Sequence, residues 1–227
     1  MERIAKNLND VSTRPPYDYN SEDRSAAVLV VLCEVDGVCH VLLNKRSESL
    51  RRHPGQVCFP GGMRDETDRS VVDTALRECE EEIQLQRDVV KVTSVLPSLK
   101  VYQKTLYLTP VICTVPPNTF ATYHFTPNPT EVADIFHVPL ATFLSETEPP
   151  LRSHSVDHPY TSFDLHHFNV EFEGKEFDVQ GITAHLCVVI AAIGLGRSPT
   201  FEYKLPSEYC VVSDEIRNRV DRIICGL

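Results

Sequence analysis

The chain has 227 residues, of which 42% are hydrophobic and 24% charged, as in a soluble globular protein that buries a substantial core. Its net charge of −10 disfavours general binding to nucleic acids or anionic membranes, so an anionic substrate must meet a local basic patch. The eight cysteines include no CxxC pair, which favours reduced, buried thiols over a zinc site and indicates a reducing compartment.

Residues 1–24 are expected to form a short helical or irregular lead-in, with Pro15 and Pro16 near its end. This segment lacks the apolar region that a secretory signal requires. The longest apolar run, residues 182–195, is interrupted by His185 and is too short to span a bilayer. We therefore expect a core helix there and no membrane span.

Two apolar runs, at 26–33 and 38–43, predict antiparallel strands, because Asp36 and Gly37 between them are typical of a hairpin turn. The second run leads into a basic segment, 45–53, with the single acid Glu48 and four basic side chains, Lys45, Arg46, Arg51 and Arg52. A basic segment is often only a solvated loop. This one directly precedes a glycine turn, and arginine binds phosphate through paired charge-assisted hydrogen bonds.

The glycine turn, at 60–62, is followed by an amphipathic helix predicted over residues 71–85, with Ser70 as its N-cap. The apolar side chains of this helix share one face: Val72, Ala75, Leu76, Cys79 and Ile83. Arg77 and the glutamates Glu78, Glu81 and Glu82 gather on the other side. Acidic runs are usually solvated faces. Here the glutamates repel one another and follow a glycine turn, which favours a site for a divalent cation and phosphate.

Beyond this helix, strands are predicted at 89–96 and 105–115, followed by a loop at 116–129. A short strand at 129–140 and a brief helix at 140–144 come next, and residues 145–161, rich in Pro, Ser and His, are expected to be a loop. Two further strands, at 163–172 and 176–179, flank a hairpin turn at 173–175. The apolar helix at 182–195 and a final amphipathic helix at 206–224 complete the chain.

Residues 59–85 resemble the Nudix box, whose Arg-Glu-x-x-Glu-Glu core is matched by residues 77–82. Three positions depart from the family pattern: the upstream acid is Asp68 rather than Glu, one extra residue separates it from Arg77, and Gln84 replaces the late glycine. That Gln84 predicts a helix end without the usual left-handed glycine. Residues 42–47, Arg51, Gly55 and 59–62 resemble the signature of the coenzyme A diphosphatase branch, which also carries the longer box with Asp.

The resemblance implies an α+β fold, a Nudix-type α/β/α sandwich with a mixed sheet and a catalytic loop-helix-loop. It implies a hydrolase domain over residues 25–203, and we expect the helix within 204–227 to pack on it. The implied activity is metal-dependent hydrolysis of the diphosphate of coenzyme A and acyl-CoAs, giving 3′,5′-ADP and (acyl-)4′-phosphopantetheine. The substrate is a small molecule, and no nucleic-acid partner is expected.

The site residues follow from the same motifs. The implied ligands of Mg²⁺ or Mn²⁺ are Glu78, Glu81, Glu82 and the Gly62 carbonyl, and Arg77 is expected to orient the glutamates. Two interpretations of Glu131 stay open, a general base or a capping residue. The residues expected to bind substrate are Arg46, Ser47, Arg51, Arg52 and Gly55.

Two alternatives remain: a Nudix pyrophosphatase for ADP-ribose, dinucleotides or capped RNA, and a non-catalytic module that binds coenzyme A or a nucleotide. The intact acidic cluster argues against the second. Segments 127–132 and 199–202 resemble animal members of the coenzyme A branch, which implies a peroxisomal location. Because Gly226 replaces the basic residue of a peroxisomal targeting tripeptide, cytoplasm or mitochondrion is the alternative. Oligomeric state is left open.

Overall fold

The computed structural model describes residues 1–12, 24–101, 106–147, 151–158 and 161–203. Its helices are α1 (Glu2–Asn9), α2 (Val71–Ile83), α3 (Thr119–Thr122) and α4 (Gly181–Leu195), with 3-10 helices η1 (Arg87–Val89) and η2 (Leu140–Leu144). Its strands are β1 (Arg24–Val35), β2 (Val38–Arg46), β3 (Val57–Cys58), β4 (Gly61–Met63), β5 (Lys91–Val95), β6 (Leu99–Val101), β7 (Leu106–Thr114), β8 (Val132–Pro139), β9 (Leu151–His158), β10 (Thr161–Phe172) and β11 (Lys175–Gln180). The helix expected at 206–224 and the C-terminal tripeptide lie outside the described residues.

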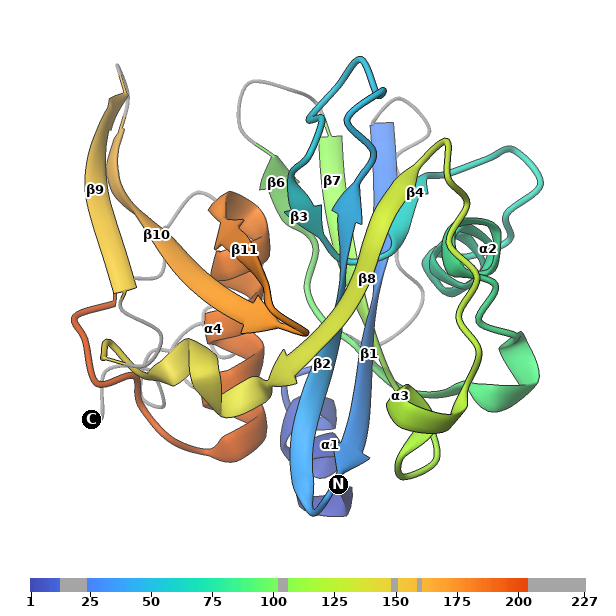
Figure 1. Ribbon diagram of the computed structural model, residues 1–227, viewed down its shortest axis with the longest axis horizontal. Coiled ribbons are helices and arrows are strands. Elements are labelled where there is room, and N and C mark those ends of the chain that lie inside the picture. Colours follow the sequence, from blue (N-terminus) through green and yellow to red (C-terminus); the bar gives the residue numbers. More distant parts are fainter. Residues whose placement is uncertain (13–23, 102–105, 148–150, 159–160, 204–227) are drawn as a thin grey trace.

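A mixed eight-stranded sheet forms the centre of the protein, in the order β3-β2-β1-β7-β5, with β4 on β1, β6 on β7 and β8 on β2. Strands β1 and β7 are parallel, and the other pairs are antiparallel. Helix α2 covers one face, while α4 and the three-stranded sheet β11-β10-β9 lie on the other (Figure 1). This confirms the α+β fold and the sandwich of helices around a mixed sheet.

The continuous apolar run of β1 is explained by burial on both faces of the sheet. Val28, Val30 and Leu32 pack in the core that α4 shares, while the alternate residues Leu29 and Val31 pack in the core under α2. A strand covered by helices on both sides has no solvent-facing positions, so its sequence does not alternate. The hairpin predicted at 36–37 joins β1 to β2 as expected.

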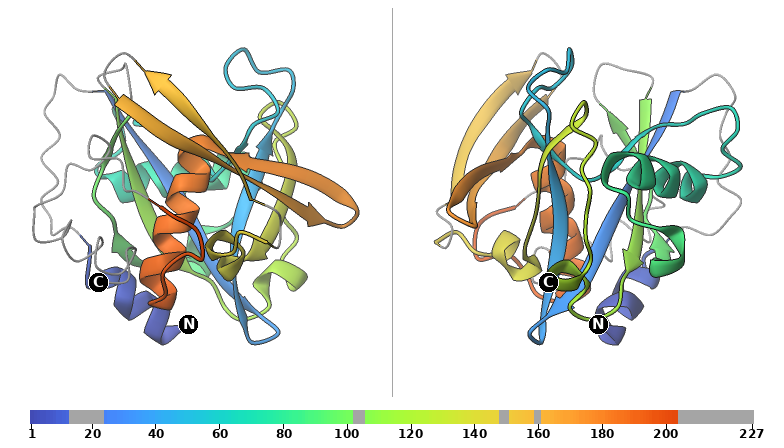
Figure 2. Two further views of the ribbon diagram at one scale, coloured as in Figure 1. Left: turned by 90° about the vertical axis from the view of Figure 1, so that its left-hand side faces the viewer. Right: turned by 45° about the vertical axis from the view of Figure 1, so that its right-hand side comes forward.

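Helix α1 packs against α4, so the N-terminal lead-in contributes to the core. Leu8 is fully buried, and Asn7 Nδ2 donates to the Gly194 carbonyl at 3.0 Å. A Cβ at Gly194 would lie 3.0 Å from Ile4, so the glycine allows close approach of the two helices (Figure 2). In the described part of the chain no helix has the length and apolarity needed to cross a bilayer, and α4 is a core helix.

Two segments differ from their predictions. Residues 151–158, expected to be loop, form β9, which pairs with β10 from Leu151 opposite Phe168 to His158 opposite Thr161. A partner strand can impose extended structure on a segment of weak intrinsic preference. The predicted loop at 116–129 contains the short helix α3.

As predicted, α2 ends without the usual left-handed glycine, and Gln84 itself takes the left-handed conformation, with φ 57° and ψ 29°. Its strained backbone is held by Tyr123. The Tyr123 hydroxyl donates to the Gln84 carbonyl at 2.7 Å and accepts from the Gln86 N–H at 3.0 Å. The contact with a loop 39 residues away thus replaces the glycine that usually ends such a helix.

We expect Gln84→Gly to stabilise the protein by about 0.5–1 kcal/mol. Glycine adopts this conformation without the Cβ clash, and this gain is partly offset by the larger conformational entropy of glycine in the unfolded chain. Thermal unfolding should show a rise in Tm of ~1–4 °C. The matched control is Gln84→Ala, which keeps the strain and should give no rise. An equal gain in both variants would contradict the explanation.

Candidate active site

The glycine turn and α2 are built so that acidic side chains of the helix face the turn. Ser70 begins α2, with its hydroxyl accepting the Asp73 N–H at 3.1 Å, as predicted for the N-cap. Strand β4 pairs with β1, placing Gly61 opposite Val28 and Gly62 opposite Ala27. Because β1 also runs under α2, the turn and the helix are fixed against the same strand.

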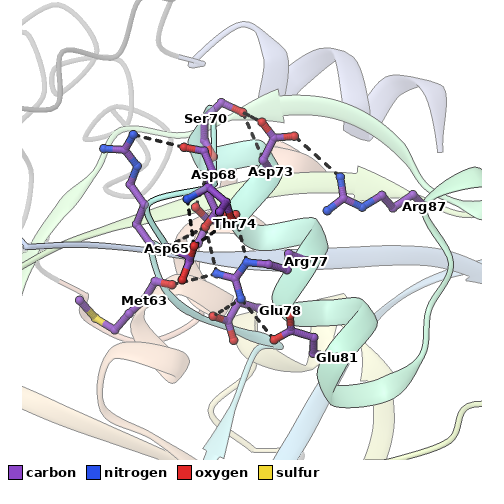
Figure 3. Close-up of polar contacts among 12 residues, drawn as sticks. Met63, Asp65, Asp68, Ser70, Asp73, Thr74, Arg77, Glu78, Glu81 and Arg87 are labelled. Carbon is purple, nitrogen blue, oxygen red and sulfur yellow. Dashed lines mark hydrogen bonds and ion pairs between the residues drawn. The ribbon is translucent and has the colours of Figure 1, made fainter.

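Arg77 makes the largest set of contacts in this region (Figure 3). Its Nε and Nη2 atoms donate to the two carboxylate oxygens of Asp68 at 3.0 and 2.9 Å, and Nη2 also donates to the Met63 carbonyl at 3.0 Å. Its Nη1 atom donates to Glu78 at 2.9 Å and to Glu81 at 3.2 Å. These hydrogen bonds lower the pKa of the buried Asp68 to about 2. The guanidinium therefore links the loop before α2 to two of its glutamates.

Glu82 is the most buried of the helix glutamates, with 4% of its surface exposed. Its Oε2 atom accepts two hydrogen bonds of 3.2 Å, from Asn44 Nδ2 and from the Gly61 N–H. Burial raises the pKa of Glu82 from 4.5 to about 8, an effect opposed by the Gly61 N–H. A buried carboxylate with a raised pKa lacks sufficient positive charge around it.

Glu78 lies against the glycine turn. A Cβ added at Gly62 would be 2.4 Å from the Glu78 carboxyl carbon, so a larger residue there would move this carboxylate from its position. Burial raises the pKa of Glu78, which the hydrogen bond from Arg77 opposes. Glu81 differs from its neighbours in being 57% exposed.

Glu131, the residue before β8, lies near the same acids. Its charge raises the pKa of both Glu78 and Glu82. Among the described residues none donates a hydrogen bond to its carboxylate, so the structure gives no support to the capping interpretation. Its backbone carbonyl accepts the Ser47 N–H at 2.8 Å, which joins this residue to the basic segment.

Arg46 ends β2 beside the acidic cluster, because it lies opposite Val132, the residue after Glu131. Its charge opposes the rise that burial causes in the pKa of Glu82 and of Cys58. The backbone closes a loop here: Arg46 N–H donates to the Gln56 carbonyl at 2.9 Å. Ser47 is 8% exposed, and its hydroxyl is 2.9 Å from that of Ser49. The start of the basic segment is thus fixed beside Glu82 and Glu131.

The remaining basic residues of this loop, residues 47–56, stand farther out. Arg51 and Arg52 are exposed, and the loop rises from the same end of the sheet as the start of β8 (Figure 1). Gly55 has φ +66°, and a Cβ there would lie 2.5 Å from the Glu48 carboxylate, which pairs with Lys45 at 3.2 Å. The structure therefore places the predicted substrate residues in two groups, one at the acids and one in the loop.

Comparison with known proteins identifies this arrangement. Residues 23–161 match the NUDIX domain, more than half of the chain. The chain belongs to the Nudix family. It is 35% identical over 196 residues to the mouse protein named peroxisomal coenzyme A diphosphatase NUDT7, covering 86% of this chain and 79% of that one.

Bacterial Nudix proteins are also similar. An uncharacterized Nudix hydrolase, NudL, from Pectobacterium atrosepticum is 41% identical over 150 residues, covering 62% of this chain and 73% of that one. Among solved structures, the Nudix hydrolase RenU of M. smegmatis is 22% identical with a TM-score of 0.45, covering 53% of this chain and 73% of that one.

Nudix hydrolases act on pyrophosphate bonds and generally use a divalent metal ion. In the described residues no three His, Cys, Asp or Glu side chains stand together as a preformed metal site, and Arg77 Nη1 instead binds both Glu78 and Glu81. The donors nevertheless suit a hard cation: all are oxygens, and the buried Glu82 and half-buried Glu78 have raised pKa values that a cation would reverse. The residues of this Nudix site therefore fit Mg²⁺ or Mn²⁺.

The structure places Arg46 and Ser47 of the basic segment next to the acidic residues, whereas the sequence motifs did not single out Asn44. Its signal was a polar side chain that directly follows the apolar run 41–43 within a strand. Asp68 was noted only as a departure from the Nudix box, although it is the main partner of Arg77.

Proposed function

We propose that this Nudix hydrolase cleaves the diphosphate bond of coenzyme A and acyl-CoAs, giving 3′,5′-ADP and (acyl-)4′-phosphopantetheine. The observation that carries the proposal is the position of Arg46 and the loop 47–56 beside the acidic cluster. Coenzyme A has a diphosphate and a separate 3′-phosphate, so it needs both a metal site and further basic groups on a chain of net charge −10. The similarity to the mouse coenzyme A diphosphatase supports this substrate.

We assign the binding of Mg²⁺ or Mn²⁺ to Glu78, Glu81, Glu82 and the Gly62 carbonyl. A bound cation of this kind neutralises phosphate charge and lowers the pKa of an attacking water. Arg77 positions the glutamates rather than contacting substrate, because its guanidinium is already engaged with Asp68, Glu78 and Glu81.

Glu131 is our candidate for the general base. Its carboxylate lies near Glu78 and Glu82 and has no hydrogen-bond donor among the described residues, so it is available to accept a proton from water. The Ser47 N–H holds its backbone in place.

The two groups of basic residues have different proposed tasks. Arg46, beside Glu82, binds the diphosphate, whereas the exposed Arg51 and Arg52 bind the 3′-phosphate. The double variant Arg51→Ala/Arg52→Ala should raise KM for coenzyme A ~10-fold or more, as expected when a charge-assisted hydrogen bond is lost, and leave kcat unchanged. Steady-state kinetics on coenzyme A and dephospho-coenzyme A measure this.

The second substrate is the control, because it lacks the 3′-phosphate and its KM should not change. Arg46→Ala should instead impair both substrates equally. Equal losses on both substrates in the double variant would refute the assignment of Arg51 and Arg52.

A substrate panel tests the proposed function itself. Purified protein with Mg²⁺ or Mn²⁺ is given coenzyme A, acyl-CoAs, ADP-ribose, NADH and capped RNA, and products are identified by mass spectrometry. We expect the highest kcat/KM on coenzyme A or an acyl-CoA. A preference for ADP-ribose, a dinucleotide or capped RNA would show that the protein has the alternative Nudix activity and not the proposed one. The absence of metal-dependent turnover on every substrate would favour a non-catalytic binding module.

For location we propose the peroxisome, on the strength of the name of the mouse relative. Residues 225–227 depart from a peroxisomal targeting tripeptide at Gly226. A fluorescent tag at the N-terminus leaves that end free, and punctate overlap with a peroxisomal marker is expected. Diffuse or mitochondrial signal would contradict this location.

A further inference from the structure

Asn44 is a fully buried polar residue in the middle of the sheet, with 0% of its surface exposed. Its strand, β2, is paired on both sides at this point, to Cys58 of β3 and to Ile135 of β8. The backbone that carries the amide is therefore held by two neighbouring strands, and a short side chain has little freedom to move.

The Asn44 amide contacts Glu82 and does so in a fixed orientation. Glu82 must be ionised to bind a cation, and an ionised carboxylate only accepts hydrogen bonds, so the amide nitrogen has to face it. Asn44 Nδ2 does so, at 3.2 Å. The Gly61 N–H donates to the same oxygen, Oε2, at 3.2 Å. The two donors leave the other oxygen, Oε1, without a hydrogen-bond donor among the described residues.

The amide orientation leaves its own oxygen unpaired. Asn44 Oδ1 is buried and has no hydrogen-bond partner among the described residues, which destabilises the fold compared with an apolar side chain of the same shape. A leucine would avoid this unpaired acceptor, so fold stability alone does not explain an asparagine. What the asparagine provides is the N–H directed at Glu82.

We infer that Asn44 is a positioning residue that holds Glu82 Oε2 and so presents Oε1 to a divalent cation. The inference rests on the proposed function, because it requires Glu82 to be a metal ligand. Hydrogen-bonding partners of metal ligands fix the orientation of the ligand, and their loss commonly weakens metal binding ~10–100-fold.

The test is a direct measurement of Mn²⁺ binding to the full-length wild-type protein and to two variants. Electron paramagnetic resonance of the free ion gives the bound fraction. Asn44→Leu removes both the donor and the unpaired acceptor, and should raise the Kd for Mn²⁺ ~10-fold or more. Its Tm should equal or exceed that of the wild type. Asn44→Asp keeps the shape but turns a carboxylate toward Glu82, and should weaken Mn²⁺ binding at least as much.

Kinetics separate positioning from a general structural effect: kcat should fall as the Kd for Mn²⁺ rises, while KM for coenzyme A at saturating metal stays within about two-fold. The matched control is Ser94→Ala on β5, which also removes a buried oxygen that has no partner in the described part of the chain, and should not change the Kd. If wild-type protein binds Mn²⁺ and both Asn44 variants bind it equally well, this inference alone is refuted. If wild-type protein binds no Mn²⁺, the proposed function fails as well.

Discussion

Replacing Glu82 with glutamine is expected to lower turnover by ~10²-fold or more, because the neutral amide cannot neutralise a divalent cation as a carboxylate does. Glutamine keeps the size of the side chain, so the fold should be unchanged by circular dichroism. Steady-state turnover with Mg²⁺ or Mn²⁺ measures the effect. Near-wild-type activity would show that Glu82 is not a ligand of the metal ion.

The same variant should change how stability depends on pH in metal-free protein. Burial raises the pKa of Glu82 from 4.5 to about 8, so the folded state binds this proton more tightly than the unfolded chain does. The free energy of unfolding of the wild type should therefore fall as pH rises from 4.5 to 8. Glu82→Gln has no such proton, so in EDTA at pH 8 it should be the more stable protein. Denaturant melts at pH 5 and pH 8 test this, and an unchanged pH dependence in the variant would contradict it.

The second large effect is expected from Gly61→Ala. Gly61 has φ +152°, and a Cβ there would lie 2.4 Å from the Ala27 carbonyl oxygen and 2.6 Å from Val28 Cα. These are backbone atoms of β1 and cannot rotate away. Strain and overpacking together should cost about 3 kcal/mol, lowering Tm by ~10 °C. Activity should also fall, because the displaced turn carries the N–H that binds Glu82.

Gly174→Ala is the matched control. Gly174 also has a positive φ, +74°, but a Cβ there would meet no atom within 4 Å. It should lose only about 1 kcal/mol and keep full activity. If the two variants lost equal stability, the close approach of the turn to β1 would not be what requires glycine at position 61.

Elements with a local signal were predicted well from the sequence. The hairpin at 36–37 follows from turn chemistry, and the Ser70 cap and apolar face of α2 follow from residues one helical turn apart. Helix α4 was predicted from a single apolar run, and it is buried. In each case the residues that determine the structure are neighbours in the chain.

Elements that depend on distant partners were not predicted. Strand β9 exists because β10 pairs with it, and its own composition is typical of a loop. Gln84 tolerates a left-handed conformation because the Tyr123 hydroxyl binds the backbone on both sides of it. No local pattern identifies such a partner.

The candidate site divides in the same way. The Nudix box gave the acids and Arg77 because they lie on one helix, and the family comparison agrees with that motif. The burial of Glu82 and the role of Asn44 depend on how β2, β4 and α2 meet in space, which spacing along the chain does not reveal.

The closed base of the loop 47–56 has a consequence for how this scaffold can change. The hydrogen bond from the Arg46 N–H to the Gln56 carbonyl joins the two ends of the loop, and the β2–β3 pairing continues next to it. The conformation of the loop is therefore largely independent of the strands that carry it. Insertions and substitutions between these two ends affect only a surface loop, and they add little to the entropic cost of loop closure. Substrate range can therefore diverge, in evolution or by grafting, through residues 48–55, whose replacement leaves Ser47 and its hydrogen bond to the Glu131 carbonyl in place.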